Sequence, residues 1–144
     1  MLFDTHAHMD DHAFDEDRAQ LLLDLPNQQI SLLMNPACSL ESSYNAVKLA
    51  NEYDYIYAAV GSHPDVANEV NEQVLESYRK LCKENSKVKA IGEIGLDYYY
   101  EDIPREVQKQ AFRAQMALAQ ELDLPVIVHE RDAHEDGMAI VEEF

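Results

Sequence analysis

The 144-residue sequence predicts an α/β fold with parallel strands, arranged as about the first five β/α units of a (β/α) barrel. Short apolar runs alternate five times with segments of helical spacing, which indicates strand-helix-strand units. The runs are short and mostly apolar, as expected for buried strands. Polar residues of the kind that bind metal ions follow several of them, as at the C-terminal mouth of a barrel. A small open doubly wound sheet is the alternative.

The expected strands are short apolar runs that end in polar residues, glycine or proline. They span residues 2–3, 30–34, 56–60, 88–94 and 126–128. Because parallel strands need crossover connections, each run should be followed by a helix packed on the sheet.

Apolar residues at helical spacing lie between these strands, within residues 14–25, 40–47, 74–82 and 107–122. The fourth segment is the clearest, because its apolar positions recur at steps of three and four and Pro104 suits the start of a helix. A fifth expected helix contains Met138, Ile140, Val141 and Phe144, and no helix-ending signal follows it. We therefore expect residues 1–144 to form a single domain, an incomplete barrel truncated near its fifth helix.

Composition limits the classes of function. The chain has 28 acidic and 11 basic side chains and a net charge of -17, which repels a polyanion unless bound cations intervene. No apolar run approaches the roughly 18 residues of a membrane span, and the N-terminus lacks the pattern of a signal peptide. Cys38 and Cys82 form no CxxC pair. We expect a cytoplasmic protein with no membrane association and no obligate protein partner.

His6 and His8 follow the first predicted strand. In extended backbone, residues two apart point to the same side, about 6.6 Å apart along the chain. Two imidazoles placed in this way can bind one divalent metal ion. The alternative is a pair of hydrogen-bonded polar residues at a strand exit.

Glu93 and His129 provide metal-type ligands from two further strands. Glu93 interrupts an apolar run, where a carboxylate is costly unless it is paired or bound to a cation. Gly92 and Gly95 flank it closely and leave room for a crowded site or a tight turn. His129 directly follows the fifth apolar run. Either residue alone could be a satisfied buried polar group, but with the histidine pair they predict one shared metal site.

Four ordered motifs, FDTHAHMD, VGSHPD, IGEIGLDYYY and LPVIVHERDA, resemble the TatD-type metal-dependent deoxyribonucleases of the amidohydrolase superfamily. The resemblance covers essentially the whole chain. It implies a TIM-like barrel, phosphodiester hydrolysis and two divalent metal ions, whether zinc, magnesium or manganese. It makes His6 and His8 ligands of one metal, Glu93 a carboxylate shared by both metals and His129 a ligand of the second. The family also takes a histidine from the sixth strand and a late aspartate, and both positions lie beyond Phe144.

The resemblance places His63 and Arg131 where substrate phosphate binds. A guanidinium can grip phosphate oxygens with two hydrogen bonds, and an imidazole can donate to them. The alternative for Arg131 is an ion pair with Glu130 or Asp132, and for His63 it is a hydrogen-bonded turn. Asp97 could orient a metal ligand from behind.

Two surface features have a structural and a functional interpretation. Residues 15–17 are acidic and suit the first turn of a helix, where the helix dipole favours carboxylates. The three tyrosines at positions 98–100 pack a loop or stack on bases, as aromatic side chains do in single-strand binders.

These observations predict a divalent-metal-dependent hydrolase that cleaves phosphodiester bonds of nucleic acid, as a DNA exonuclease, with Glu93 as the catalytic residue. Its partner would be DNA or another phosphodiester substrate, and metals would supply the positive charge that the sequence lacks. One alternative is the same barrel hydrolysing a non-nucleic ester or amide. The other is an inactive, truncated interaction module.

Overall fold

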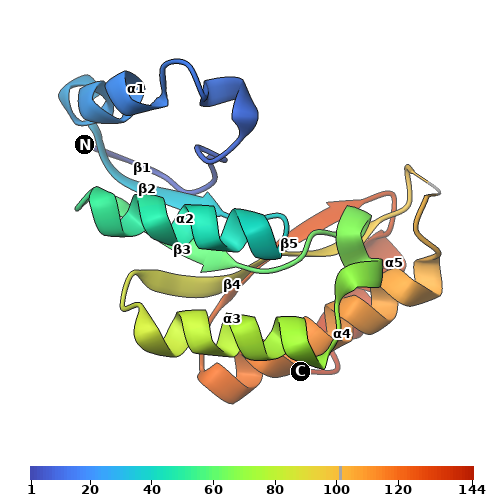
Figure 1. Ribbon diagram of the computed structural model, residues 1–144. Coiled ribbons are helices and arrows are strands. Elements are labelled where there is room, and N and C mark those ends of the chain that lie inside the picture. The colour runs from blue at the N-terminus through green and yellow to red at the C-terminus, as the bar shows by residue number, and fades with distance from the viewer. Residues whose placement is uncertain (101) are drawn as a thin grey trace.

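The computed structural model describes residues 1–100 and 102–144. Its five strands form one parallel sheet in the order β1-β2-β3-β4-β5 (Figure 1). The strands are β1 (Leu2–Asp4), β2 (Ile30–Pro36), β3 (Ile56–Val60), β4 (Val88–Asp97) and β5 (Val126–Arg131). A doubly wound sheet would reverse its strand order partway, whereas this order is sequential throughout. The sheet is therefore part of a barrel, as predicted.

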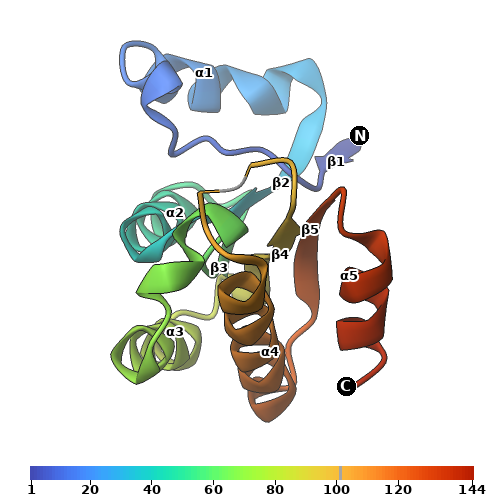
Figure 2. The same ribbon diagram turned by 90° about the vertical axis from the view of Figure 1, so that its right-hand side faces the viewer.

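Helices α2, α3 and α4 cover one face of the curved sheet (Figure 2). The helices are α1 (Arg18–Asp24), α2 (Leu40–Glu52), α3 (Glu72–Glu84), α4 (Arg105–Leu122) and α5 (His134–Val141), with short 3-10 turns at His12–Phe14, Leu25–Gln28 and Pro64–Glu69. Side-chain caps begin two of them. The Asn71 side chain accepts from two amides at the start of α3, and Ser39 accepts from the Ser42 amide at the start of α2.

The first helical segment differs from the prediction. Residues 15–17 are not in the first turn of α1, which begins at Arg18. Asp15 instead accepts a hydrogen bond from the Arg18 guanidinium at 2.7 Å. That guanidinium also donates to the Met9 carbonyl at 2.6 Å, so it fixes the loop after β1. The prediction that residues 15–17 form the first turn of a helix was wrong, because the helix begins directly after them.

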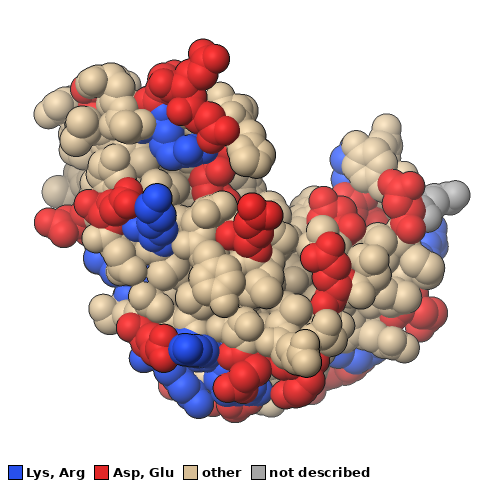
Figure 3. Space-filling view, viewed as in Figure 1, with Lys and Arg blue, Asp and Glu red and all other residues tan. Residues whose placement is uncertain are grey.

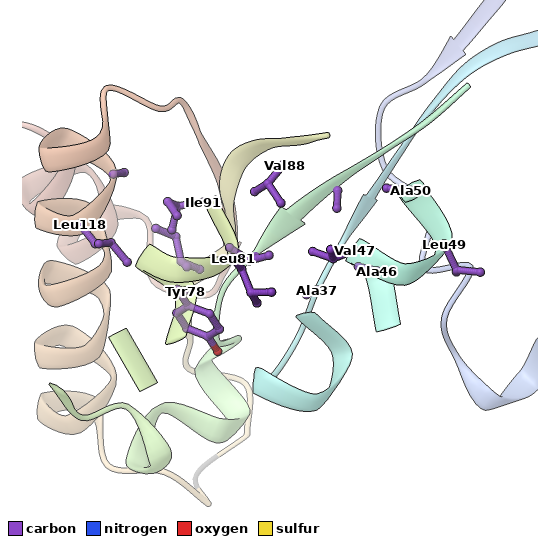
Figure 4. Close-up of a cluster of buried hydrophobic side chains, with 14 of the residues drawn as sticks. Ala37, Ala46, Val47, Leu49, Ala50, Tyr78, Leu81, Val88, Ile91 and Leu118 are labelled. Carbon is purple, nitrogen blue, oxygen red and sulfur yellow. The ribbon is translucent and has the colours of Figure 1, made fainter. Parts of the chain in front are cut away.

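The main core lies between the sheet and its helices. Tyr78 and Leu81 of α3 meet Leu118 of α4 and the strand residues Val88 and Ile91 in a continuous apolar layer (Figure 4). Burial raises the pKa of Tyr78 to about 12, and its hydroxyl lies 2.7 Å from the Ser62 hydroxyl. This packing holds α3 and α4 against the middle of the sheet.

A smaller apolar cluster lies on the opposite face of the sheet. It contains Met34, Ala59 and Ala90, with Tyr57 and Ile127 packed against it. On the helix-covered side, which Figure 3 shows, acidic groups outnumber lysine and arginine among the other residues. Across residues 1–100 and 102–144, no helix combines the length and apolar character needed to cross a membrane.

Strand β4 has a bulge where it carries the predicted carboxylate. Ile91 pairs with Val126 and Ile94 pairs with Val128, so β4 advances three residues while β5 advances two. A bulge of this kind changes the direction of the side chains within it. The Glu93 amide donates to the Ala37 carbonyl at 2.7 Å, which ties the bulge to the loop after β2.

Gly95 allows β4 and β5 to approach closely just beyond the bulge. Its φ is +146°, and a Cβ atom at this position would overlap the carbonyl oxygen of His129. Only glycine tolerates both conditions. The strands continue further than predicted, to Asp97 and Arg131, because residues 95–97 of β4 pair with residues 129–131 of β5. Glu93 and His129 therefore lie within strands and not at their ends.

Candidate metal centre

His6, His8 and Glu93 meet beyond the end of β1. The Nε2 atoms of the two histidines lie 3.1 Å apart. The Glu93 Oε2 atom lies 3.2 Å from His6 Nε2 and 3.3 Å from His8 Nε2. Two imidazole nitrogens and a carboxylate oxygen thus converge within 4.8 Å of one another, which is the donor set that zinc-like ions prefer.

The backbone determines which nitrogen of His8 faces Glu93. Its Nδ1 atom lies 2.9 Å from the Pro36 carbonyl oxygen, which can only accept a hydrogen bond. Nδ1 therefore carries a proton, and in the neutral ring the Nε2 lone pair points toward the carboxylate. Lone pairs facing one another in this way repel unless a proton or a cation lies between them.

In the metal-free protein, protons serve as that positive charge. Contacts with the Cys38 sulfur and the Glu93 carboxylate raise the pKa of His8 to about 10. Burial alone would raise the pKa of Glu93, but hydrogen bonds with His129 and His8 lower it well below its usual range. Glu93 is only 7% exposed, and its ionic contacts within the described residues are all with histidines.

The second oxygen of Glu93 faces a different group of residues. Its Oε1 atom lies 3.2 Å from Nδ1 of His129. The other ring nitrogen of His129, Nε2, lies 2.9 Å from Oδ2 of Asp97. The contact with Glu93, more than that with Asp97, raises the pKa of His129 in the metal-free protein. One carboxylate therefore joins the β1 histidines to the β5 histidine.

His63 completes this second group. Its ring centroid lies 4.2 Å from that of His129, and ligand atoms of His63, Asp97 and His129 converge within 4.8 Å. The Nδ1 atom of His63 lies 2.7 Å from Asp65 Oδ1, a contact that lowers the pKa of Asp65. Asp65 was missed by the sequence analysis, although the spacing His-x-Asp after a strand gave a signal for it.

Asp97 links this group to the following loop. One carboxylate oxygen faces His129, and the other accepts from the Tyr99 amide at 3.0 Å. Gln108 of α4 holds the Asp97 backbone, with its side-chain oxygen 2.8 Å from the amide and its side-chain nitrogen 2.9 Å from the carbonyl. These contacts hold Asp97 in place against the His129 ring, where a carboxylate can orient an imidazole.

Arg131 does not form the ion pair that the sequence offered as an alternative to phosphate binding. It forms no ion pair with Glu130 or Asp132, both of which the structure describes. Its guanidinium carbon lies 3.7 Å from the centroid of the Tyr99 ring and 5.3 Å from that of Tyr100. The side chain is exposed, on the same strand as His129 and two residues beyond it.

The residues present fit divalent metal ions. Neutral imidazole and carboxylate are suitable ligands. Among residues 1–100 and 102–144, only histidines form ionic contacts with the buried Glu93 carboxylate. His6, His8 and Glu93 provide three donors for one ion, and Glu93 and His129 provide two for another. His63 and Asp97 lie close enough to add donors to the second position.

Comparison with known proteins supports the same conclusion. The family model of TatD related DNase matches residues 3–144. The uncharacterized metal-dependent hydrolase YabD of Bacillus subtilis is 39% identical over 143 residues, covering 99% of this chain and 56% of that protein. A 3'-5' ssDNA/RNA exonuclease TatD of Pectobacterium atrosepticum is 34% identical, covering 92% of this chain and 51% of its own length.

Solved structures show the same fold. The Escherichia coli TatD homolog YJJV superposes with a TM-score of 0.90 and 31% identity, and 99% of this chain covers 55% of it. A TatD family hydrolase of Entamoeba histolytica gives a TM-score of 0.90 at 27% identity, and 54% of it is covered. The chain spans about half the length of the curated relatives it matches. The family match over residues 3–144 and the shared fold show that the chain belongs to the TatD family.

Proposed function

We propose that the protein is a two-metal phosphodiesterase that hydrolyses nucleic acid, and acts on DNA as an exonuclease. The observation that carries this proposal is the position of Glu93, whose two oxygens face different histidine groups. In the proposal, His6 and His8 bind the first metal, His129 binds the second, and Glu93 bridges them. The similarity to the 3'-5' ssDNA/RNA exonuclease TatD of Pectobacterium atrosepticum supports a nucleic-acid substrate.

Divalent cations bound there would supply positive charge to the phosphate oxygens and lower the pKa of an attacking water molecule. The residues of this chain would position the metal ligands and balance their charge. Pro36 fixes His8 in the tautomer that offers Nε2, and Asp97 holds the ring of His129. Glu93 carries one negative charge between the two groups, so the site accepts cations despite its burial. Cations at this position also offset the repulsion between a chain of charge -17 and a polyanion.

In the proposal, Arg131 binds substrate phosphate. A guanidinium that lies over an aromatic ring keeps its N–H donors at its edge, where phosphate oxygens can accept from them. Arg131→Ala should raise KM for an oligonucleotide several-fold and change kcat little. Arg113→Ala is the matched control, because Arg113 is a partly exposed arginine that pairs with Glu143 away from the site.

The test of the proposed function compares substrates under defined metal. Purified protein is stripped with a chelator, reloaded with Mn²⁺, Mg²⁺ or Zn²⁺, and given single-stranded DNA, single-stranded RNA and a carboxylic ester. Metal-dependent release of mononucleotides from a strand is expected. Ester hydrolysis without nucleotide release would instead support a non-nucleic substrate, and no metal-dependent turnover of any substrate would support an inactive interaction module.

A further inference from the structure

The three consecutive tyrosines after β4 differ in their surroundings. Tyr98 is partly buried, donates a hydrogen bond from its hydroxyl to Asp136 at 2.6 Å, and has the Arg105 guanidinium over its ring. Tyr99 and Tyr100 are each 57% exposed. Loop packing accounts for Tyr98, but it leaves more than half of each of the other two side chains in solvent.

The two exposed rings lie against each other and against a cation. Their centroids are 4.8 Å apart in an edge-to-face arrangement, and the Arg131 guanidinium lies over Tyr99. The Tyr98 amide donates to the Arg131 carbonyl at 2.9 Å, which ties the start of the loop to β5. The Asp97 carboxylate accepts from the Tyr99 amide while it also contacts His129. The Tyr99 backbone is thus linked through Asp97 to His129 of the candidate metal centre.

Tyr100 also lines a cavity of about 280 Å³ beside the second group of the metal centre. The other lining residues are His63, Asp65, Asp97, Asp102, Ile103 and Gln108. Three carboxylates here disfavour an anionic phosphate within the cavity. A neutral planar ring is compatible with both these carboxylates and the aromatic wall. The guanidinium of Arg131, which lies over Tyr99 and is not part of the cavity lining, attracts the phosphate instead.

We propose that Tyr99 and Tyr100 form a stacking site for an unpaired nucleobase of a single strand, next to a phosphate held by Arg131. This inference rests on the proposed function and names the form of nucleic acid that the site selects. Stacking uses the face of the base, which all four bases have, so the site selects single strands without a sequence preference. A base within a duplex must first leave its stack and its partner, so paired ends bind more weakly.

The test removes the base and the rings separately and then together. The probe is a short fluorescein-labelled oligothymidylate with phosphorothioate linkages that resist cleavage, and its binding to the full chain is measured by anisotropy with Mg²⁺. Two further probes carry an abasic residue at the 3' end or at the 5' end. The protein variants are Tyr99→Ala, Tyr100→Ala and the double variant.

For wild type, removal of the base at one end should weaken binding about tenfold, which lies within the range reported for one base on an aromatic side chain. The double alanine variant should bind the intact strand about tenfold more weakly, and loss of the same base should then cost less than about twofold. Tyr99→Phe and Tyr100→Phe should restore binding, because they keep the ring and remove only the hydroxyl. Tyr44→Ala is the matched control, since Tyr44 is 52% exposed on α2.

The outcomes separate the two proposals. If wild type binds the strand but the losses from the abasic end and from the alanines add independently, the stacking site is wrong and the proposed function stands. If the alanine variants lose binding but the phenylalanine variants do not recover it, the ring is not the contact and the inference also falls. If the wild-type protein with metal neither binds nor cleaves any strand, both the proposed function and the stacking site are wrong.

Discussion

Asp97 Oδ2 lies 2.9 Å from His129 Nε2, on the side of the imidazole opposite to Glu93. When Asp97 accepts a hydrogen bond from Nε2–H of the neutral ring, the Nδ1 lone pair of His129 is directed at the Glu93 carboxylate. A carboxylate placed behind a histidine in this way fixes the tautomer of the ring and makes its free nitrogen a better metal ligand.

Asp97→Asn should weaken binding of the second metal about 10- to 100-fold, the usual effect of losing such a support. The amide is a weaker acceptor and can present a donor to Nε2, whereas its oxygen can still accept from the Tyr99 amide. Isothermal titration with Zn²⁺ measures the change. Asp24→Asn, on the surface of α1, is the control. Unchanged affinity for both metals would show that Asp97 has only a structural role.

Glu93→Gln should lower metal-dependent turnover by more than about 100-fold, beyond the loss caused by removing an outer partner. A neutral amide cannot offer one anionic oxygen to each histidine group, so both metal positions weaken together. Circular dichroism should show that the variant still folds. Glu84→Gln at the end of α3 is the matched exposed control. Near wild-type turnover at limiting metal would rule out the bridging role.

The metal-free protein should lose stability as the pH rises above about 6.5. The pKa of His8 is raised from 6.5 to about 10 in the folded chain, so protonated His8 stabilises the folded state. This stabilisation is complete below pH 6.5 and is lost as the pH rises through the pKa of the folded chain. Metal binding needs unprotonated imidazole, so metal-dependent stabilisation should increase over the same range. Thermal melts with a chelator and with Mn²⁺ across this range should diverge. Parallel curves would contradict the prediction.

Gly95→Ala should destabilise the protein by on the order of 3 kcal/mol, because the added Cβ meets the His129 carbonyl oxygen at a φ that alanine rarely adopts. Gly137→Ala is the matched control. Gly137 lies within α5, and a Cβ atom there would make an ordinary contact with Glu130 Cγ of β5 at 3.6 Å. This change should therefore stabilise the protein by roughly 0.5–1 kcal/mol. Urea unfolding compares the two. A Gly95→Ala protein as stable as wild type would contradict the close strand approach.

The five strands and the convergence of His6, His8, Glu93 and His129 could be predicted from the sequence, although Glu93 and His129 lie within their strands and not at the ends. Apolar runs locate strands, and their carboxyl ends share one edge of a parallel sheet. The β4 bulge could not be predicted, since it depends on how Ile91 and Ile94 pair with a strand about 35 residues away. The contact of Arg131 with the Tyr99 ring also could not be predicted, because an arginine between Glu130 and Asp132 suggests an ion pair with one of them.

His6 and Glu93 lie 87 positions apart in the chain, yet their side chains touch. An ion held between them would close a loop that contains three strands. The entropic cost of closing a loop grows with its length. Strand β1 has only three residues, and within the described part of the chain it pairs with β2 alone. Removal of the ion should therefore let the segment before β2 open without global unfolding. Hydrogen exchange would detect this opening as faster exchange of the β1 amides in chelator, while the amides of α3 and α4 stay protected. Bound metal would then hold the first β/α unit closed against the rest of the sheet.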